Sequence, residues 1–235
     1  RLEAQIEVNG MQAPIEEEAE VIRALSRVEP LHIVNEDSKA AEIIKPYLRG
    51  QDIGRWLPEW NGLWMIFARR GIDIEKYPSV LRHLESLRTQ LEPKPNNWTP
   101  PRKGAKWPGR KAGSYRWYEI QDAVEYYADF DVPKILLRRI AFYAQVCTDN
   151  GEYMVNDSAL ILPKADEWIV ACLNSPVGWY FQFKEFPHKK DEALAFDIPY
   201  VRNFPIPQLE HDQRNAFEEC VYAVKKSTDI VEQAD

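Results

Sequence analysis

Residues 133–162 read PKILLRRIAFYAQVCTDNGEYMVNDSALIL, and the fold class follows chiefly from this segment. Its runs of aliphatic and β-branched residues predict strands at 133–140, 142–147, 153–155 and 159–162. Between the second and third of these lies Asp149-Asn-Gly, which is typical of a type I′ turn because Asn and Gly accept a positive φ. We therefore expect an antiparallel sheet, with Asn150-Gly151 at the tip of a β-hairpin that joins strands near 142–148 and 152–156.

Helical patterns flank this segment on both sides. Leucines three to four residues apart predict a helix over 77–91, and further helices are expected at 166–174, 176–186 and 210–234. A helix that begins at Pro14 should end before Pro30. The segment 92–113 is rich in Pro and Gly and should form no regular element. The fold class expected is α+β, a mixed domain with a largely antiparallel sheet, flanking helices and a C-terminal helix.

The charge of the chain is unevenly distributed. The total is −7, but residues 1–44 contribute −6 and residues 208–235 contribute −4, so the middle carries +3. Residues 93–118, called here the basic segment, hold seven Lys and Arg and no acidic residue. A polyanionic partner responds to this local charge more than to the total. The three cysteines form no CxxC pair, which argues against a disulfide framework or a zinc site and favours core packing in a reducing cytosol.

A more specific pattern begins at Lys45. Lys45-Pro-Tyr-Leu-Arg-Gly-Gln-Asp-Ile-Gly-Arg-Trp resembles the opening segment of the TaqI-like C-terminal specificity domain, the target-recognition domain of adenine-N6 DNA methyltransferases and fused type II restriction–modification enzymes. Further motifs follow in the order typical of that family, across residues 44–235. They are Arg70-Gly-Ile-Asp-Ile-Glu-Lys-Tyr-Pro, Trp117-Tyr-Glu-Ile, Val132-Pro-Lys-Ile, Asp149-Asn-Gly-Glu-Tyr, Asn156-Asp-Ser, Val170-Ala-Cys-Leu-Asn-Ser-Pro and Arg202-Asn-Phe-Pro-Ile-Pro.

This resemblance implies a division of the chain. Residues 1–43 would be a helical linker from the junction with a catalytic domain, 44–207 the DNA target-recognition domain, and 208–235 a C-terminal helix. The family's catalytic half binds S-adenosylmethionine through a Gly-rich turn and holds the adenine with an Asn/Asp-Pro-Pro-aromatic tetrapeptide, and this sequence contains neither. We therefore expect no enzyme activity, cofactor or catalytic residue in this chain. The parent would be a cytoplasmic, prokaryotic methyltransferase that uses S-adenosylmethionine, and the family it resembles includes enzymes fused to a nuclease.

The basic segment supplies the main candidates for DNA contact. Lys and Arg can bind phosphates or guanine edges, and aromatic rings can stack on bases. Its candidates are Trp98, Arg102, Lys103, Lys106, Trp107, Arg110, Lys111, Tyr115 and Arg116. The alternative is a solvated loop whose tryptophans fold back onto the domain. A loop of this composition should contribute little to a core.

Four arginines outside the basic segment are also candidates. Arg49 and Arg55 could face DNA, or they could belong to a structural turn in which Asp52 caps the backbone or pairs with an arginine. Arg138 and Arg139 are adjacent on a predicted strand, so one of them should point outward. The four histidines show no metal-binding spacing, so no metal site is expected.

The function expected from these observations is sequence-specific recognition of double-stranded DNA on behalf of a methyltransferase catalytic domain in the same parent chain. A protein-interaction module is the alternative, because the end helices are acidic and amphipathic. An enzyme of another type ranks last, because no convergent acid, base or nucleophile set is visible. No apolar run approaches the roughly 18 residues of a membrane span.

Overall fold

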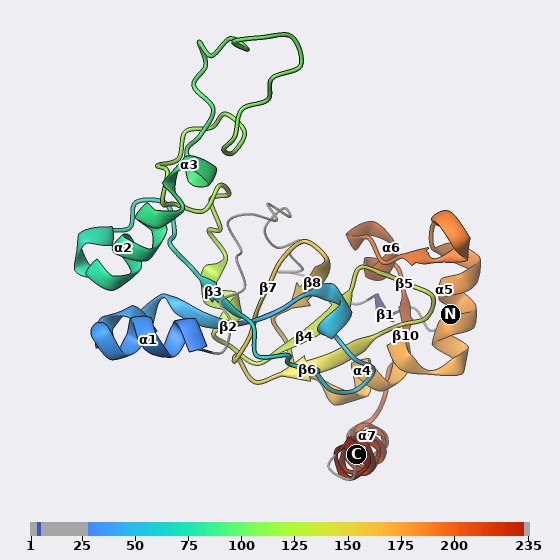
Figure 1. Cartoon of the computed structure of the whole chain (residues 1–235). Helices are drawn as coiled ribbons and strands as arrows, with labels where there is room; N and C mark the ends of the chain where they lie inside the picture. Colours follow the sequence, from blue (N-terminus) through green and yellow to red (C-terminus); the bar gives the residue numbers. More distant parts are fainter. Residues whose placement is uncertain (1–3, 6–27, 233–235) are drawn as a thin grey trace. The chain divides into compact units, whose positions relative to one another are not determined.

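The computed structural model describes residues 4–5 and 28–232, and the chain divides into two compact units. Unit 1 contains Leu48–Asn61 and the described part of Tyr126–Asp235, together with the short strand β1 (Ala4–Gln5). Unit 2 contains the described part of Glu16–Tyr47 and Gly62–Glu125. Each unit is therefore built from separate stretches of the chain, and Figure 1 labels their elements.

A three-stranded antiparallel sheet forms the centre of unit 1. Strand β4 (Lys134–Arg138) lies in the middle and pairs on one side with β6 (Val146–Asp149) and on the other with β8 (Ala159–Leu162). Leu136 is opposite Cys147 in one pair and opposite Ile161 in the other. Every residue of β8 is buried, which agrees with its uninterrupted apolar sequence.

The predicted hairpin is wrong in its pairing and in its type I′ turn, because Asn150 lacks the positive φ that this turn requires at both central residues. Gly151 has φ +90, but β6 pairs with β4, and β7 (Met154–Val155) is not part of that sheet. The carboxylate of Asp149 accepts hydrogen bonds from the backbone N–H groups of Glu152 (3.1 Å) and Tyr153 (3.3 Å) and also binds the buried ammonium of Lys134. The side chain of Asp149 thus holds the turn, and the residues that follow the turn do not pair with β6.

Helices and two short strand pairs complete unit 1. Helix α4 (Glu167–Asn174) packs against β6 and against the long C-terminal helix α7 (His211–Glu232), and α5 (Pro176–Glu185) follows α4 directly. The predicted helices at 166–174, 176–186 and 210–234 are thus confirmed. The remaining elements are η2 (Gly50–Asp52), η4 (Tyr127–Phe130), η5 (Lys190–Glu192), α6 (Ile198–Arg202), and the pairs β5 (Ile140–Ala141) with β9 (Leu194–Ala195) and β1 with β10 (Pro205–Ile206).

Unit 2 joins a short strand pair to small helices. Strand β2 (Ile44–Leu48) pairs antiparallel with β3 (Trp64–Ile66), so Ile44 lies opposite Ile66. The leucine pattern forms α2 (Pro78–Ser86) and α3 (Arg88–Leu91), with Leu87 between them. The other elements are α1 (Val28–Glu36), η1 (Ser38–Glu42) and η3 (Ile74–Lys76). The expected helix from Pro14 lies outside the described residues.

Pro30 lies within the first turn of α1 and does not end a helix. The first turn tolerates proline because its N–H groups have no intrahelical acceptor. With this difference, the α+β class with mostly antiparallel pairing and a C-terminal helix is confirmed. None of the described helices is long and apolar enough to cross a bilayer.

Candidate nucleic-acid interface

The basic segment folds into a long loop with a closed stem. Pro93 and Arg110 form a parallel bridge, in which Arg110 N–H donates to the Glu92 carbonyl (3.0 Å) and Lys94 N–H donates to the Arg110 carbonyl (2.9 Å). Figure 1 shows the chain running out beyond α3 in an extended loop and returning beside it. Residues 95–109 are called here the outer loop. No helix or strand is found in it, as its Pro and Gly content predicts.

Arg110 holds this stem from inside, and its exposed fraction is 5%. Its Nε donates to the Leu91 carbonyl (2.7 Å) and Nη1 to the Glu119 carbonyl (2.8 Å). Its Nη2 donates to the carbonyls of Arg116 (3.2 Å) and Trp117 (2.9 Å). A guanidinium with these partners cannot also reach a phosphate, so the sequence-based placement of Arg110 at the DNA surface is corrected. The expectation that this segment contributes little to a core is wrong for the same reason.

Tyr115 is the second candidate that lies inside. Its exposed fraction is 5%, its ring lies under the Arg110 guanidinium (4.3 Å), and its hydroxyl donates to the Lys111 carbonyl. A ring covered in this way has no open face for a base. Its expected stacking on DNA is therefore corrected to a packing role in the stem.

The two tryptophans of the outer loop are half-buried and contact each other. Trp107 Nε1 donates to the Glu92 carbonyl (2.9 Å), and the Trp98 ring meets the Trp107 ring edge to face, with centroids 5.8 Å apart. The Lys94 ammonium lies 4.9 Å from the centroid of Trp98. The tryptophans thus fold back onto the stem. This is the arrangement predicted by the alternative to base stacking, a loop whose tryptophans pack against their own domain.

The far end of the outer loop presents cations to solvent. Arg102, Lys103 and Lys106 are exposed, and none of them has an ion-pair partner among the residues that the structure describes. The turn between them is closed by Ala105 N–H and the Arg102 carbonyl (3.1 Å), with Gly104 at φ +84. Lys111 and Arg116 are exposed near the stem, where Arg116 also donates to the Tyr118 hydroxyl (2.6 Å). Arg116 is also paired with Glu119 (4.0 Å), whereas the surface formed by Arg102, Lys103 and Lys106 is positive.

In the opening motif, Asp52 pairs with Arg49. The sequence allowed two roles for Arg49, DNA contact or a structural turn, and this ion pair is the one expected for the turn. Arg49 Nε and Nη2 donate to the two carboxylate oxygens (2.8 and 2.7 Å), and Asn61 adds a bond of 3.0 Å. Burial of Asp52 alone would raise its pKa, but the hydrogen bonds and charge of Arg49 outweigh burial, and the pKa is lowered. The Arg49 side chain keeps 43% of its surface exposed.

The other candidate arginines are engaged by their own unit. Arg55 donates to the Asn174 carbonyl and lies over the ring of Trp56, a residue held at φ +90. Arg138 and Arg139 are both half-buried, so neither points fully outward as expected for one of them. Arg138 donates to Gln145 Oε1 (2.7 Å), and Arg139 pairs with Asp197 (3.1 Å).

The sequence did not reveal a pocket beside Arg55, lined by aromatic side chains of residues 142–143 and of α5. The runs Phe142-Tyr143 and Trp179-Tyr180-Phe181 were the available signal. Over residues 4–5 and 28–232, no group of three or more His, Cys, Asp or Glu side chains is arranged to hold a metal ion.

Comparison with known proteins agrees with this architecture. Residues 45–206 match the family described as the TaqI-like C-terminal specificity domain. The fold is similar to part of the type IIL restriction–modification enzyme MmeI, solved in complex with DNA, with a TM-score of 0.60 and 15% identity. That match covers 97% of this chain and 30% of the MmeI chain. No curated protein matches the sequence. Because the family match spans most of the sequence, the chain belongs to the TaqI-like C-terminal specificity domain family.

Proposed function

We propose that this chain recognises a specific sequence in double-stranded DNA and directs an adenine-N6 methyltransferase of the restriction–modification type to it. The observation that carries the proposal is the outer loop, which exposes Arg102, Lys103 and Lys106 without a neutralising carboxylate in the basic segment. Membership of a specificity-domain family and the fold similarity to an enzyme solved with DNA support it.

The proposal divides the work of a longer parent protein. Methyl transfer and S-adenosylmethionine belong to a catalytic domain, which must extract an adenine from the helix at a cost of a few kcal/mol. The specificity domain supplies grip through phosphates and choice through base edges. Lysines suit the first task because they act as point charges, whereas Arg102 and Arg116 can bind a guanine edge in a bidentate manner.

Neutralising the exposed lysines tests the proposal. Lys103, Lys106 and Lys111 are replaced together by alanine, and affinity for a duplex is measured between 50 and 300 mM salt. If all three bind phosphates, affinity falls for every sequence and the log–log salt slope decreases by about 2.7, since each phosphate contact contributes about 0.9. Arg110 is left unchanged because its guanidinium holds the stem.

The matched control replaces three exposed lysines on other elements, Lys76, Lys164 and Lys226, and so removes the same charge. Their loss should leave the slope close to that of the wild type. Equal slopes in all three proteins would contradict the proposal. The interaction-module alternative would then lead, since the acidic helix α7 exposes Phe217 and Tyr222.

A further inference from the structure

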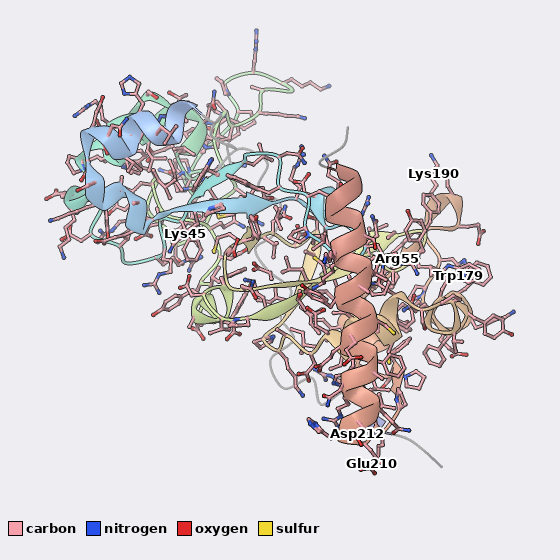
Figure 2. The ribbon with its side chains drawn as sticks, turned by 90° about the horizontal axis from the view of Figure 1, so that it is seen from below. Lys45, Arg55, Trp179, Lys190, Glu210 and Asp212 are labelled. Atoms are coloured by element: carbon pink, nitrogen blue, oxygen red, sulfur yellow. The ribbon has the colours of Figure 1, made fainter. Side chains whose placement is uncertain are left out.

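A pocket of about 550 Å³ in unit 1 is lined by no residue of the basic segment. Its walls include Phe142, Tyr143, Trp179 and Phe183, with Arg55 and Glu192 at its edges, and it is called here the aromatic pocket. Its volume lies in the range of small-molecule sites. Figure 2 shows Arg55 and Trp179 on the same side of unit 1, with Lys190 beyond them.

The aromatic walls are unusually open to solvent. Phe142 is 60% exposed, Tyr143 51% and Trp179 39%, and Val177 and Tyr180 on the adjoining helix are also exposed. Large apolar side chains gathered on one surface usually mark a binding site, because leaving them in water forgoes the free energy of burial. Flat rings with open faces suit a flat ligand, which can stack on them.

The walls are held in place by bonds within unit 1. Trp179 Nε1 donates to the Phe142 carbonyl (3.3 Å), which ties the helix to the loop, and the rings of Trp179 and Phe183 stack with centroids 5.3 Å apart. Asn174 is buried, with an exposed fraction of 2%. Its side-chain amide donates to the Val146 carbonyl (2.8 Å), and its backbone carbonyl accepts a hydrogen bond from Arg55. The pocket is therefore formed before any ligand arrives.

The lining of the pocket contains one cation, Arg55, and one carboxylate, Glu192. Ser175 and Pro176, also in the lining, begin helix α5. The first turn of a helix carries a partial positive charge that favours anions. The one carboxylate in the lining, that of Glu192, is bound by His188 Nδ1 at 2.7 Å. Outside the lining, Lys184 is followed by Glu185 at the end of the same helix, and Lys189 and Lys190 are followed by Asp191 and Glu192.

We infer that the aromatic pocket receives an unstacked nucleotide of the bound DNA, with its base between the aromatic walls and its phosphate toward Arg55. A flat, aromatic and anionic ligand fits this combination of rings, guanidinium and helix start, whereas a purely apolar partner would make no use of the charge of Arg55. The inference rests on the proposed function, since the nucleotide comes from DNA that the chain binds.

A duplex with one bulged nucleotide tests the inference, with the fully paired duplex of the same sequence beside it. The probes carry a fluorescent label, and the whole chain is titrated against each by anisotropy. The wild type should bind the bulged duplex about 5- to 150-fold more tightly, the range that corresponds to stacking one base on aromatic side chains. A bulged nucleotide is already unstacked, so the chain does not have to extrude it.

Phe142→Ala with Tyr143→Ala should abolish this preference and leave the affinity for the paired duplex within twofold. The exposed Tyr222 on α7 provides the matched control, and Tyr222→Ala should retain the preference. The inference is overturned if the wild type binds both probes with equal affinity, or if the preference survives the double substitution. A protein partner would then be the better candidate for this surface. Tight binding of the paired duplex without a bulge preference would leave the proposed function intact. A pocket-dependent bulge preference without paired-duplex binding would refute the proposed function alone.

Discussion

Replacing Arg110 by Met should loosen the stem of the basic segment without removing a phosphate contact. The methionine side chain is unbranched like that of arginine, and it has no hydrogen-bond donor. The substitution deprives the carbonyls of Leu91 and Glu119, both buried residues, of their guanidinium partner. A buried acceptor without a donor costs about 1–3 kcal/mol. Part of this cost is offset because a guanidinium is no longer taken out of water. We expect a net loss of about 2–4 kcal/mol from these terms.

Hydrogen exchange measured by mass spectrometry isolates this effect. The free energy of opening should fall for amides between residues 88 and 119 and stay unchanged in unit 1, because all four carbonyl partners of Arg110 belong to unit 2. Lys111→Met, one residue further along and exposed, is the control, and a surface change of this kind usually costs under about 0.5 kcal/mol.

DNA binding separates the two possible roles of Arg110. A looser outer loop has to be ordered on binding, so Arg110→Met should weaken affinity while the log–log salt slope stays at the wild-type value. A slope reduced by about 0.9 with unchanged hydrogen exchange would show that the guanidinium binds a phosphate. That result would refute the reasoning from its buried position.

Three further predictions follow from local geometry. Gly151→Ala should lower the free energy of unfolding by about 1–3 kcal/mol in urea denaturation, because φ is +90 and a Cβ would lie 2.7 Å from the Asp131 carbonyl oxygen. The pKa of Asp52 is lowered in the folded chain, so its contribution to stability is present above its unfolded pKa of about 3.9 and is lost as pH falls through the folded value. Asp52→Asn should therefore be less stable than the wild type at pH 7 and should lose less further stability on acidification. Thermal melting measured against pH checks this. A thiol reagent should modify Cys220, which is exposed, and spare the other two cysteines of the native chain, whose thiol pKa values burial raises.

Much of the fold follows from local sequence signals. The apolar run of 159–162 forms the expected strand, and the leucine spacing of 77–91 forms helix as expected, although Leu87 divides it into α2 and α3. The hairpin prediction failed because Asn150-Gly151 indicates a turn but does not determine which strand β6 pairs with. β6 pairs instead with β4, the strand that precedes it by a short connection, with Leu137 opposite Val146.

The candidate interface was less predictable than the fold. A count of positive residues in the basic segment cannot distinguish Arg110, whose guanidinium points inward, from Lys106, which is exposed. That distinction depends on four carbonyl groups supplied by residues 91 and 116–119, which are brought together only when the stem closes. The aromatic pocket was missed for the same reason, because its walls come from residues 142–143 and from α5.

The interleaving of the two units along the chain affects how the protein forms on the ribosome. Unit 2 has all of its residues once Glu125 has been synthesised, whereas unit 1 still lacks every strand of its main sheet at that point. Leu48–Asn61, which includes the fully buried Ile53, must therefore wait for partners that are made much later. Domains fold largely in the order of their synthesis, and apolar segments exposed in the meantime are prone to aggregate. Within the opening motif, Ile53 thus stays without its packing partners until the strands of unit 1 have been synthesised.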